Sequence, residues 1–131
     1  GEHVIAKEVE QSMREAIQAF GASINEFTVA PQINPENNEL PYHEWFIEFE
    51  EKPSDMEGFA KKIDETLQQQ NSYYFDLIQG KVLQQLKITS LDSGAFTNFM
   101  KSKGKLGGQN KIQRLANDRN IADALEEFIK R

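Results

Sequence analysis

The segment 42–50, with the sequence YHEWFIEFE, places the strongest constraint on the fold. Its apolar residues Trp45, Ile47 and Phe49 alternate with glutamates. Alternation with period two is typical of a β-strand that has one face on a core and one face toward solvent. Phe46 interrupts the charged face, so we expect local cover there. The chain must therefore form a half-buried sheet and supply helices for its apolar face.

Two more strands are expected, one on each side of this segment in the sequence. Residues 23–30 carry apolar side chains at strand spacing. The stretch 31–41 that follows contains three prolines and three asparagines, which favour a loop. A third strand is expected within residues 83–91. We therefore expect the first two strands to form an antiparallel hairpin and the third to return after a helical crossover.

Apolar residues recur at helical spacing in residues 4–20, 54–70 and 95–103, and in a last helix around Ile121. Residues 72–80 are compatible with a short helix or an irregular packed turn. The order α-β-β-α-β-α-α predicts an α+β fold. We expect a small two-layer domain in which a mixed sheet of three or more strands packs with helices.

The composition excludes several functions. The chain carries 21 acidic and 15 basic residues, a net charge of −6, which argues against binding of nucleic acid or anionic membrane over the whole surface. It contains no cysteine, which excludes a thiolate metal site and is compatible with a reducing compartment, so we expect the cytoplasm. His3 and His43 lie far apart and outside any HExxH pattern, so we expect no metal site.

Residues 101–114, with the sequence KSKGKLGGQNKIQR, break the acidic trend with five basic residues, three glycines and no carboxylate. Glycines let a backbone approach a phosphate closely, and lysines can reach it. The Walker A spacing is absent, because Lys111 is followed by Ile112 rather than by Ser or Thr. The segment follows a helix rather than a strand, unlike a dinucleotide fingerprint. The residues alone leave two interpretations, a solvated basic linker and a phosphate-directed loop.

Two separate segments resemble the auxin-responsive Gretchen Hagen family of acyl-acid amido synthetases, which belongs to the adenylate-forming superfamily. YHEWFIEFE is similar to a sheet strand of that family, and SGAFTNFMKSKGKLGGQNKIQRLANDR, residues 93–119, is similar to its C-terminal signature. The stretch FTVAPQI agrees as well, and the match is closer to the bacterial members than to the plant hormone-conjugating ones. The resemblance covers roughly residues 4–119.

The resemblance implies that residues 1–131 form a single domain, the small C-terminal lid of a larger enzyme. The chain opens on Gly1 without a methionine, and we expect it to be part of a longer protein whose N-terminal domain binds ATP and the carboxylic acid. In the family's reaction the carboxylate attacks the α-phosphate of ATP, giving acyl-AMP and pyrophosphate. An amine, usually of an amino acid, then displaces AMP and forms an amide.

The same resemblance implies the partners and the cofactor. ATP, with Mg as its partner, would be bound mainly by the absent domain, and the isolated chain is expected to be inactive. The expected partners are the N-terminal domain and the carboxylic acid and amine substrates, without nucleic acid or membrane.

The resemblance also assigns roles within the basic segment. Lys111 aligns with the lysine of the family's GQxK motif and would stabilise negative charge on the phosphates and the attacking carboxylate. Gly107 and Gly108 would let the backbone pass close to the nucleotide. Gln109 would fix the loop or touch a phosphate, and Arg114 would anchor the loop or assist the charge.

Other features of the segment are less closely tied to the reaction. Lys103 and Lys105 would only supply positive potential that attracts ATP. The sequence departs from the family at Gln113, where proline is more common. Two other functions remain open: a free-standing module that binds phosphorylated ligands or nucleic acid through residues 101–114, and a pure interaction domain. The aromatic residues do not interleave with the basic segment, which disfavours a platform for base stacking.

Overall fold

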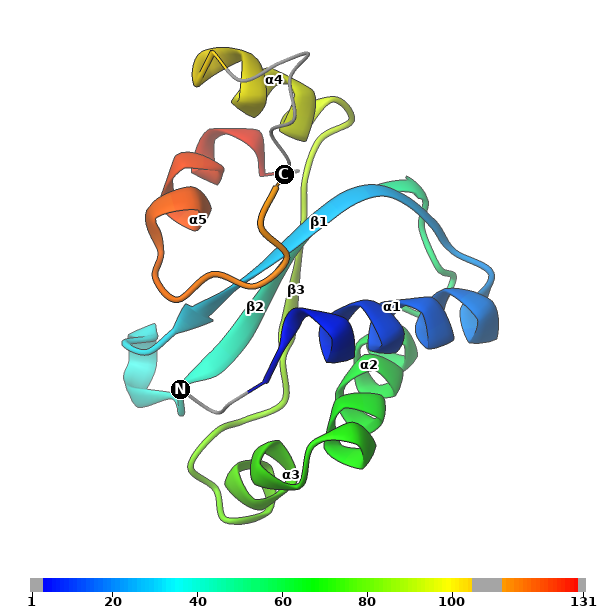
Figure 1. The fold of residues 1–131 in the computed structure, drawn as a ribbon, viewed down its shortest axis with the longest axis vertical. Coiled ribbons are helices and arrows are strands. Elements are labelled where there is room, and N and C mark those ends of the chain that lie inside the picture. The colour runs from blue at the N-terminus through cyan, green and yellow to red at the C-terminus, as the bar shows by residue number, and fades with distance from the viewer. Residues whose placement is uncertain (1–3, 105–111, 130–131) are drawn as a thin grey trace.

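The computed structural model describes residues 4–104 and 112–129. Figure 1 shows, in chain order, α1 (Ala6–Phe20), β1 (Ser23–Gln32), the 3₁₀ helix η1 (Glu36–Asn38), β2 (Tyr42–Glu51), α2 (Met56–Gln70), α3 (Ser72–Gln79), β3 (Lys87–Ser90), α4 (Ala95–Ser102), α5 (Asn120–Ala124) and the 3₁₀ helix η2 (Glu126–Phe128). The α+β class and the predicted order of elements are confirmed, and residues 72–79 form a helix rather than an irregular turn.

The three strands form one mixed sheet in the order β1-β2-β3. β1 pairs with β2 antiparallel, with Val29 opposite Trp45. β3 pairs with β2 parallel, with Ile88 beside Trp45. The predicted hairpin and helical crossover are therefore both present. The third strand is shorter than the stretch 83–91 in which it was expected.

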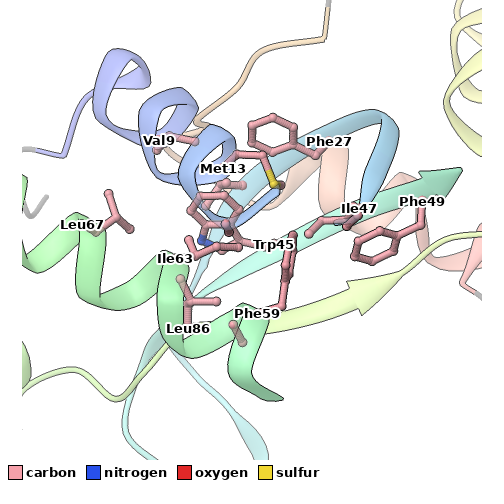
Figure 2. Close-up of a cluster of buried hydrophobic side chains, with 14 of the residues drawn as sticks. Val9, Met13, Phe27, Trp45, Ile47, Phe49, Phe59, Ile63, Leu67 and Leu86 are labelled. Atoms are coloured by element: carbon pink, nitrogen blue, oxygen red, sulfur yellow. The ribbon is translucent and has the colours of Figure 1, made fainter. Parts of the chain in front are cut away.

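The first face of the sheet carries α1 and α2. Trp45 is completely buried there, and the ring of Phe27 stacks on it with a centroid distance of 5.6 Å and an interplanar angle of 3°. Figure 2 shows this cluster, which includes Val9, Met13, Ile63 and Leu67 from the two helices. The stripes of apolar residues predicted along both helices are the surfaces that pack on the sheet.

The second face of the sheet is also covered. Phe46 is completely buried in a separate cluster. Its other large members come from the region of α4 and α5, namely Phe96, Phe99 and Leu125. Neighbouring residues of a strand point to opposite faces, so Trp45 and Phe46 require a helical layer on each side, as Figure 1 shows.

The cover expected over Phe46 is confirmed, and the prediction of a solvent-facing charged side on β2 is confirmed at the exposed Glu50 but is wrong at Glu48. Glu48 lies on that side with only 5% of its surface exposed. The reason is that α4 begins against Glu48. The side chain therefore contacts the end of a helix instead of water, although its place in the alternating pattern predicts exposure.

Local signals set other boundaries less accurately. The spacing of Ser54 and Glu57 predicts a capping box for α2, but the helix begins at Met56 and Asp55 is its cap. The Asp55 carboxylate accepts a hydrogen bond from the Gly58 N–H at 2.9 Å. The two acceptors lie one residue apart in sequence, so spacing alone does not decide between them.

The stretch between β1 and β2 is tied to the rest of the domain. Lys87 Nζ lies 2.6 Å from Glu39 Oε1. Gln84 donates from its side chain to the Leu40 carbonyl oxygen at 2.7 Å and from its backbone N–H to the Pro41 carbonyl oxygen at 3.0 Å. None of the helices within residues 4–104 and 112–129 is long and apolar enough to cross a membrane.

The burial of Phe46 gives a test of the second layer. Phe46→Ala should lower the free energy of unfolding by about 3–5 kcal/mol, because it removes a large side chain from a packed site and leaves a cavity. Urea denaturation followed by circular dichroism measures the change, and the exposed Lys61→Ala should stay near the wild-type value. A loss below about 1 kcal/mol, as expected for a surface position, would contradict a second core.

The contact between Glu39 and Lys87 predicts a pH dependence. The hydrogen bond from Lys87, followed by that from Gln84, holds the pKa of the Glu39 carboxyl below its ordinary value. The stabilisation is therefore complete above the ordinary carboxylate pKa and is lost as the pH falls through the lowered pKa. Lys87→Met should return the pKa of Glu39 toward its ordinary value, while Lys61→Met should not. Carbon-13 NMR titration of the side-chain carboxyl measures this, and an unchanged pKa in Lys87→Met would exclude the pairing.

Candidate functional site

The basic segment predicted as the site is described at its two ends. Five of the residues singled out in the sequence lie outside the described residues: Lys105, Gly107, Gly108, Gln109 and Lys111. Lys103 lies at the end of α4, and Arg114 lies in the stretch that leads back to the sheet. The structure describes what flanks residues 105–111, namely α4 on one side and residues 112–116 on the other, and these two parts are called the frame below.

The start of α4 is fixed by the buried carboxylate of Glu48 on β2. One carboxylate oxygen accepts the backbone N–H of Gly94 at 3.0 Å and the side-chain amide of Asn25 at 2.9 Å. The other oxygen accepts the backbone N–H of Phe96 at 3.0 Å. The first N–H groups of a helix have no partner within the helix, and negative charge there also suits the helix dipole. Gly94 has φ of +86°, a conformation that a residue with a side chain rarely adopts.

The last turn of α4 presents lysines to solvent. Lys101 and Lys103 are both exposed. Lys103 Nζ lies 5.9 Å from the centre of the Phe99 ring, and the hydroxyl of Ser102 donates to the Phe99 carbonyl oxygen at 2.6 Å. Positive charge at the C-terminal end of a helix is favourable. The ammonium groups at this end of the segment are accessible to an anion.

Arg114, at the other end, is held by two carboxylates. Its guanidinium donates to Glu26 and lies 3.3 Å from the carboxylate of Glu10 on α1. It also donates to the carbonyl oxygen of Phe27 at 2.8 Å, and its central carbon lies 4.5 Å from the centre of the Phe27 ring. A planar guanidinium can make all of these contacts at once. The positive charge of Arg114 is therefore compensated within the domain.

The backbone of residues 113–116, where the basic segment ends, is fixed along the free edge of β1. The Val29 N–H donates to the carbonyl oxygen of Arg114, and the Ala116 N–H donates to the carbonyl oxygen of Val29, both at 2.9 Å. The Thr28 hydroxyl donates to the carbonyl oxygen of Gln113. This hydrogen bond restrains the backbone at Gln113. Ile112 is 9% exposed and belongs to the second core cluster.

A second arginine, Arg119, was not singled out in the sequence. It lies 2.8 Å from the carboxylate of Glu44 on β2 and donates to the Pro31 carbonyl oxygen at 3.3 Å. Its guanidinium carbon lies 5.7 Å from the centre of the Phe46 ring. Glu44 and Glu48 both follow the pattern of a solvated strand face. The one signal against that interpretation is Phe46 between them, which indicates that the face is covered.

The described ends of the basic segment carry lysine and arginine side chains, which do not serve as ligands for a metal. Within residues 4–104 and 112–129, no group of three histidine, aspartate or glutamate side chains could hold a metal ion. The described part of the segment offers exposed lysine ammonium groups at the end of α4 and, at Arg114, a guanidinium whose charge is already compensated.

Comparisons with known proteins identify a family and solved structures to which this chain is similar. The family model described as the GH3 family C-terminal domain matches residues 7–120. Among solved structures, 22 chains match. The GH3.15 acyl acid amido synthetase superposes with a TM-score of 0.74 at 17% identity, over 95% of this chain and 24% of that one. The AtGH3.15 acyl acid amido synthetase in complex with 2,4-DB gives a TM-score of 0.73 at 17% identity, over the same shares.

At this identity the solved structures show a shared fold. The chain spans 24% of the length of these two synthetases. No curated protein matches the chain by sequence.

The Glu48 anchor gives a test of the frame. Glu48→Gln should lower the free energy of unfolding by about 1.5–3 kcal/mol, because the amide keeps one acceptor oxygen and turns an N–H donor toward another donor. Thermal and urea denaturation measure the loss. Glu51→Gln, at the exposed end of the same strand, is the matched control and should have little effect. Equal stability of the two variants would show that Glu48 does not hold α4.

Proposed function

The chain belongs to the GH3 family as its C-terminal domain, and from this premise we propose that it is the lid domain of an ATP-dependent acyl acid amido synthetase. The intact protein would adenylate a carboxylic acid and transfer the acyl group to an amine, usually of an amino acid. The observation that carries the proposal is the family match over residues 7–120, which includes the whole basic segment. The fold shared with the GH3.15 acyl acid amido synthetase supports it.

The proposed catalytic residue is Lys111. In adenylation a carboxylate oxygen attacks the α-phosphorus of ATP, the bond to the bridging oxygen of the β-phosphate breaks, and pyrophosphate leaves. Negative charge grows on the phosphate oxygens during this exchange. A cation placed there in advance can lower the barrier by a few kcal/mol, roughly a hundredfold in rate. Gly107 and Gly108 would allow close approach to the nucleotide, and Gln109 would fix the loop or contact a phosphate.

The frame supports such placement. Glu48 fixes the helix before the segment, and Ile112, the residue directly after Lys111, is buried in the second core cluster. A catalytic group held between fixed ends loses less entropy when it meets its substrate. Lys103 and Lys105 would add positive potential that attracts ATP, and Lys103 is exposed at the end of α4.

The remaining parts of the reaction would lie outside this chain. The N-terminal domain would bind ATP, with Mg as its partner, and would select the acid and the amine. The chain spans 24% of the synthetases it resembles, which is in keeping with a separate, larger domain. On this proposal the isolated chain is inactive, the enzyme is of the bacterial type and it works in the cytoplasm.

The contacts of Arg114 weaken the competing proposal of a free-standing anion-binding module. Its charge is compensated by Glu10 and Glu26. The segment therefore offers a phosphate or a nucleic acid less positive charge than its composition suggests, whereas a single well-placed lysine is enough for adenylation.

The role of Lys111 is tested with the full-length protein. Carboxylate-dependent exchange of pyrophosphate into ATP is measured with a panel of aryl and alkyl acids. Lys111→Ala should lower the exchange rate at least about tenfold, because the cation acts in the transition state. Lys61→Ala on α2 is the control and should resemble the wild type. Near-wild-type exchange in Lys111→Ala, or no exchange in the wild type with any acid, would overturn the proposed function.

A further inference from the structure

Arg114 and its two carboxylates join three parts of the chain that are distant in sequence. Glu26 and Glu10 lie 88 and 104 positions before Arg114. We propose that Glu26, with Glu10 as a weaker second partner, is a positioning residue for adenylation. Acting through Arg114, it sets where residues 113–116 join the edge of β1. This inference rests on the proposed function. The group formed by Arg114, Glu26 and Glu10 is called the exit clamp below.

The geometry of the exit clamp is that of an anchor rather than of a surface ion pair. The Arg114 side chain is 28% exposed and that of Glu26 is 29% exposed. The same guanidinium also binds the Phe27 carbonyl oxygen and lies over the Phe27 ring, which is itself stacked on Trp45. Charge-assisted hydrogen bonds from a planar fork to several acceptors fix both partners, which one contact to a flexible lysine would not do. The exit of the segment is therefore tied to the centre of the first core.

Of the two carboxylates, Glu26 is the more firmly held partner of Arg114. It accepts the backbone N–H of Phe27 at 3.0 Å, which orients it toward Arg114. The pairing of β1 with β2 shifts register between Ile24 and Glu26, and irregularities of this kind redirect side chains. The Glu10 side chain is 45% exposed and lies 3.3 Å from Arg114 Nε. Solvent screens such a pair, so its contribution is small.

The contacts of Arg114 indicate a positioning residue rather than a catalytic one. A guanidinium that already binds two carboxylates and a carbonyl oxygen would have to break these contacts to bind a phosphate. Its effect instead passes through the backbone, because the carbonyl oxygens of Gln113 and Arg114 are held by Thr28 and Val29. Loss of the exit clamp should therefore lower kcat for adenylation, while the KM for ATP changes little.

The chain offers a matched control in Arg119. It also pairs with a strand carboxylate, Glu44, at 2.8 Å, and it also lies over a core aromatic ring, Phe46. Its side chain is 20% exposed. It follows the described exit segment and is bound to Glu44 on β2 and to the Pro31 carbonyl oxygen near the end of β1. Its removal should therefore affect stability without releasing residues 113–116.

The experiment compares Arg114→Met, Arg119→Met and Lys111→Ala in the full-length protein. Acid-dependent ATP–pyrophosphate exchange gives kcat and the KM for ATP, and thermal unfolding gives stability. Arg114→Met should lower kcat about tenfold or more with little change in KM. Arg119→Met should lower the unfolding temperature to a similar extent and leave kcat within about twofold of the wild type.

Two further measurements separate positioning from general destabilisation. The isosteric Glu26→Gln should also lower kcat, and the double variant Glu26→Gln/Arg114→Met should be no slower than Arg114→Met alone, because the two residues act as a unit. Hydrogen exchange followed by mass spectrometry should show faster exchange in residues 27–30, which precede the Pro31 contact of Arg119, in Arg114→Met than in Arg119→Met.

The outcomes are distinguishable. The exit clamp would be overturned by wild-type kcat in Arg114→Met, by an equal loss of kcat in Arg114→Met and Arg119→Met, or by a raised KM for ATP with unchanged kcat. In each of these cases, a slow Lys111→Ala variant would leave the proposed function standing. Additive losses of kcat in the double variant would show that Glu26 does not act through Arg114 and would overturn its role as a positioning residue. Wild-type exchange in Lys111→Ala would overturn the proposed function and this inference together.

Discussion

The fold depends on the opposite orientation of two adjacent aromatic side chains on β2. Trp45 and Phe46 are both completely buried, and they point to opposite faces of the sheet. Burial of a large apolar side chain stabilises the folded state by about 1.5–3 kcal/mol, so neither face can be left to water. This requirement places α1 and α2 on one side and α4 and α5 on the other, and it decides where the basic segment can begin and end.

Because the second face is covered, the carboxylates on that face need partners. A buried carboxylate without hydrogen bonds is strongly unfavourable. Glu48 meets this need with the N–H groups at the start of α4, and Glu44 meets it with Arg119 and the hydroxyl of Thr89. Each carboxylate thereby becomes an attachment point for a later part of the chain. The same principle operates at the sheet edge, where Glu26 holds Arg114.

Much of the fold follows from local patterns, and most of the site does not. The alternation in 42–50, the proline-rich connection after the first strand and the spacing of apolar residues in the helices predict the elements and their order. Phe46 predicts cover on the charged face, but nothing near it shows that a helix would begin against Glu48. The partner groups lie 46 and 48 positions later. Ion pairs between distant residues leave no local signature, so Arg114 could be recognised as part of a motif but its partners could not.

The pairing of Val29 with residues 114–116 has a consequence for how the domain protects itself. An unpaired strand edge is a template for addition of a strand from another chain. The short parallel bridge between Val29 and Leu115 covers β1 at this point, opposite the side on which β1 pairs with β2. Contacts between residues so far apart in the sequence form slowly, since a long loop must close first. A growing or refolding chain therefore exposes this edge of β1 until its last quarter has been made and has docked, and solubility during folding depends on the same residues that hold the basic segment in the folded domain.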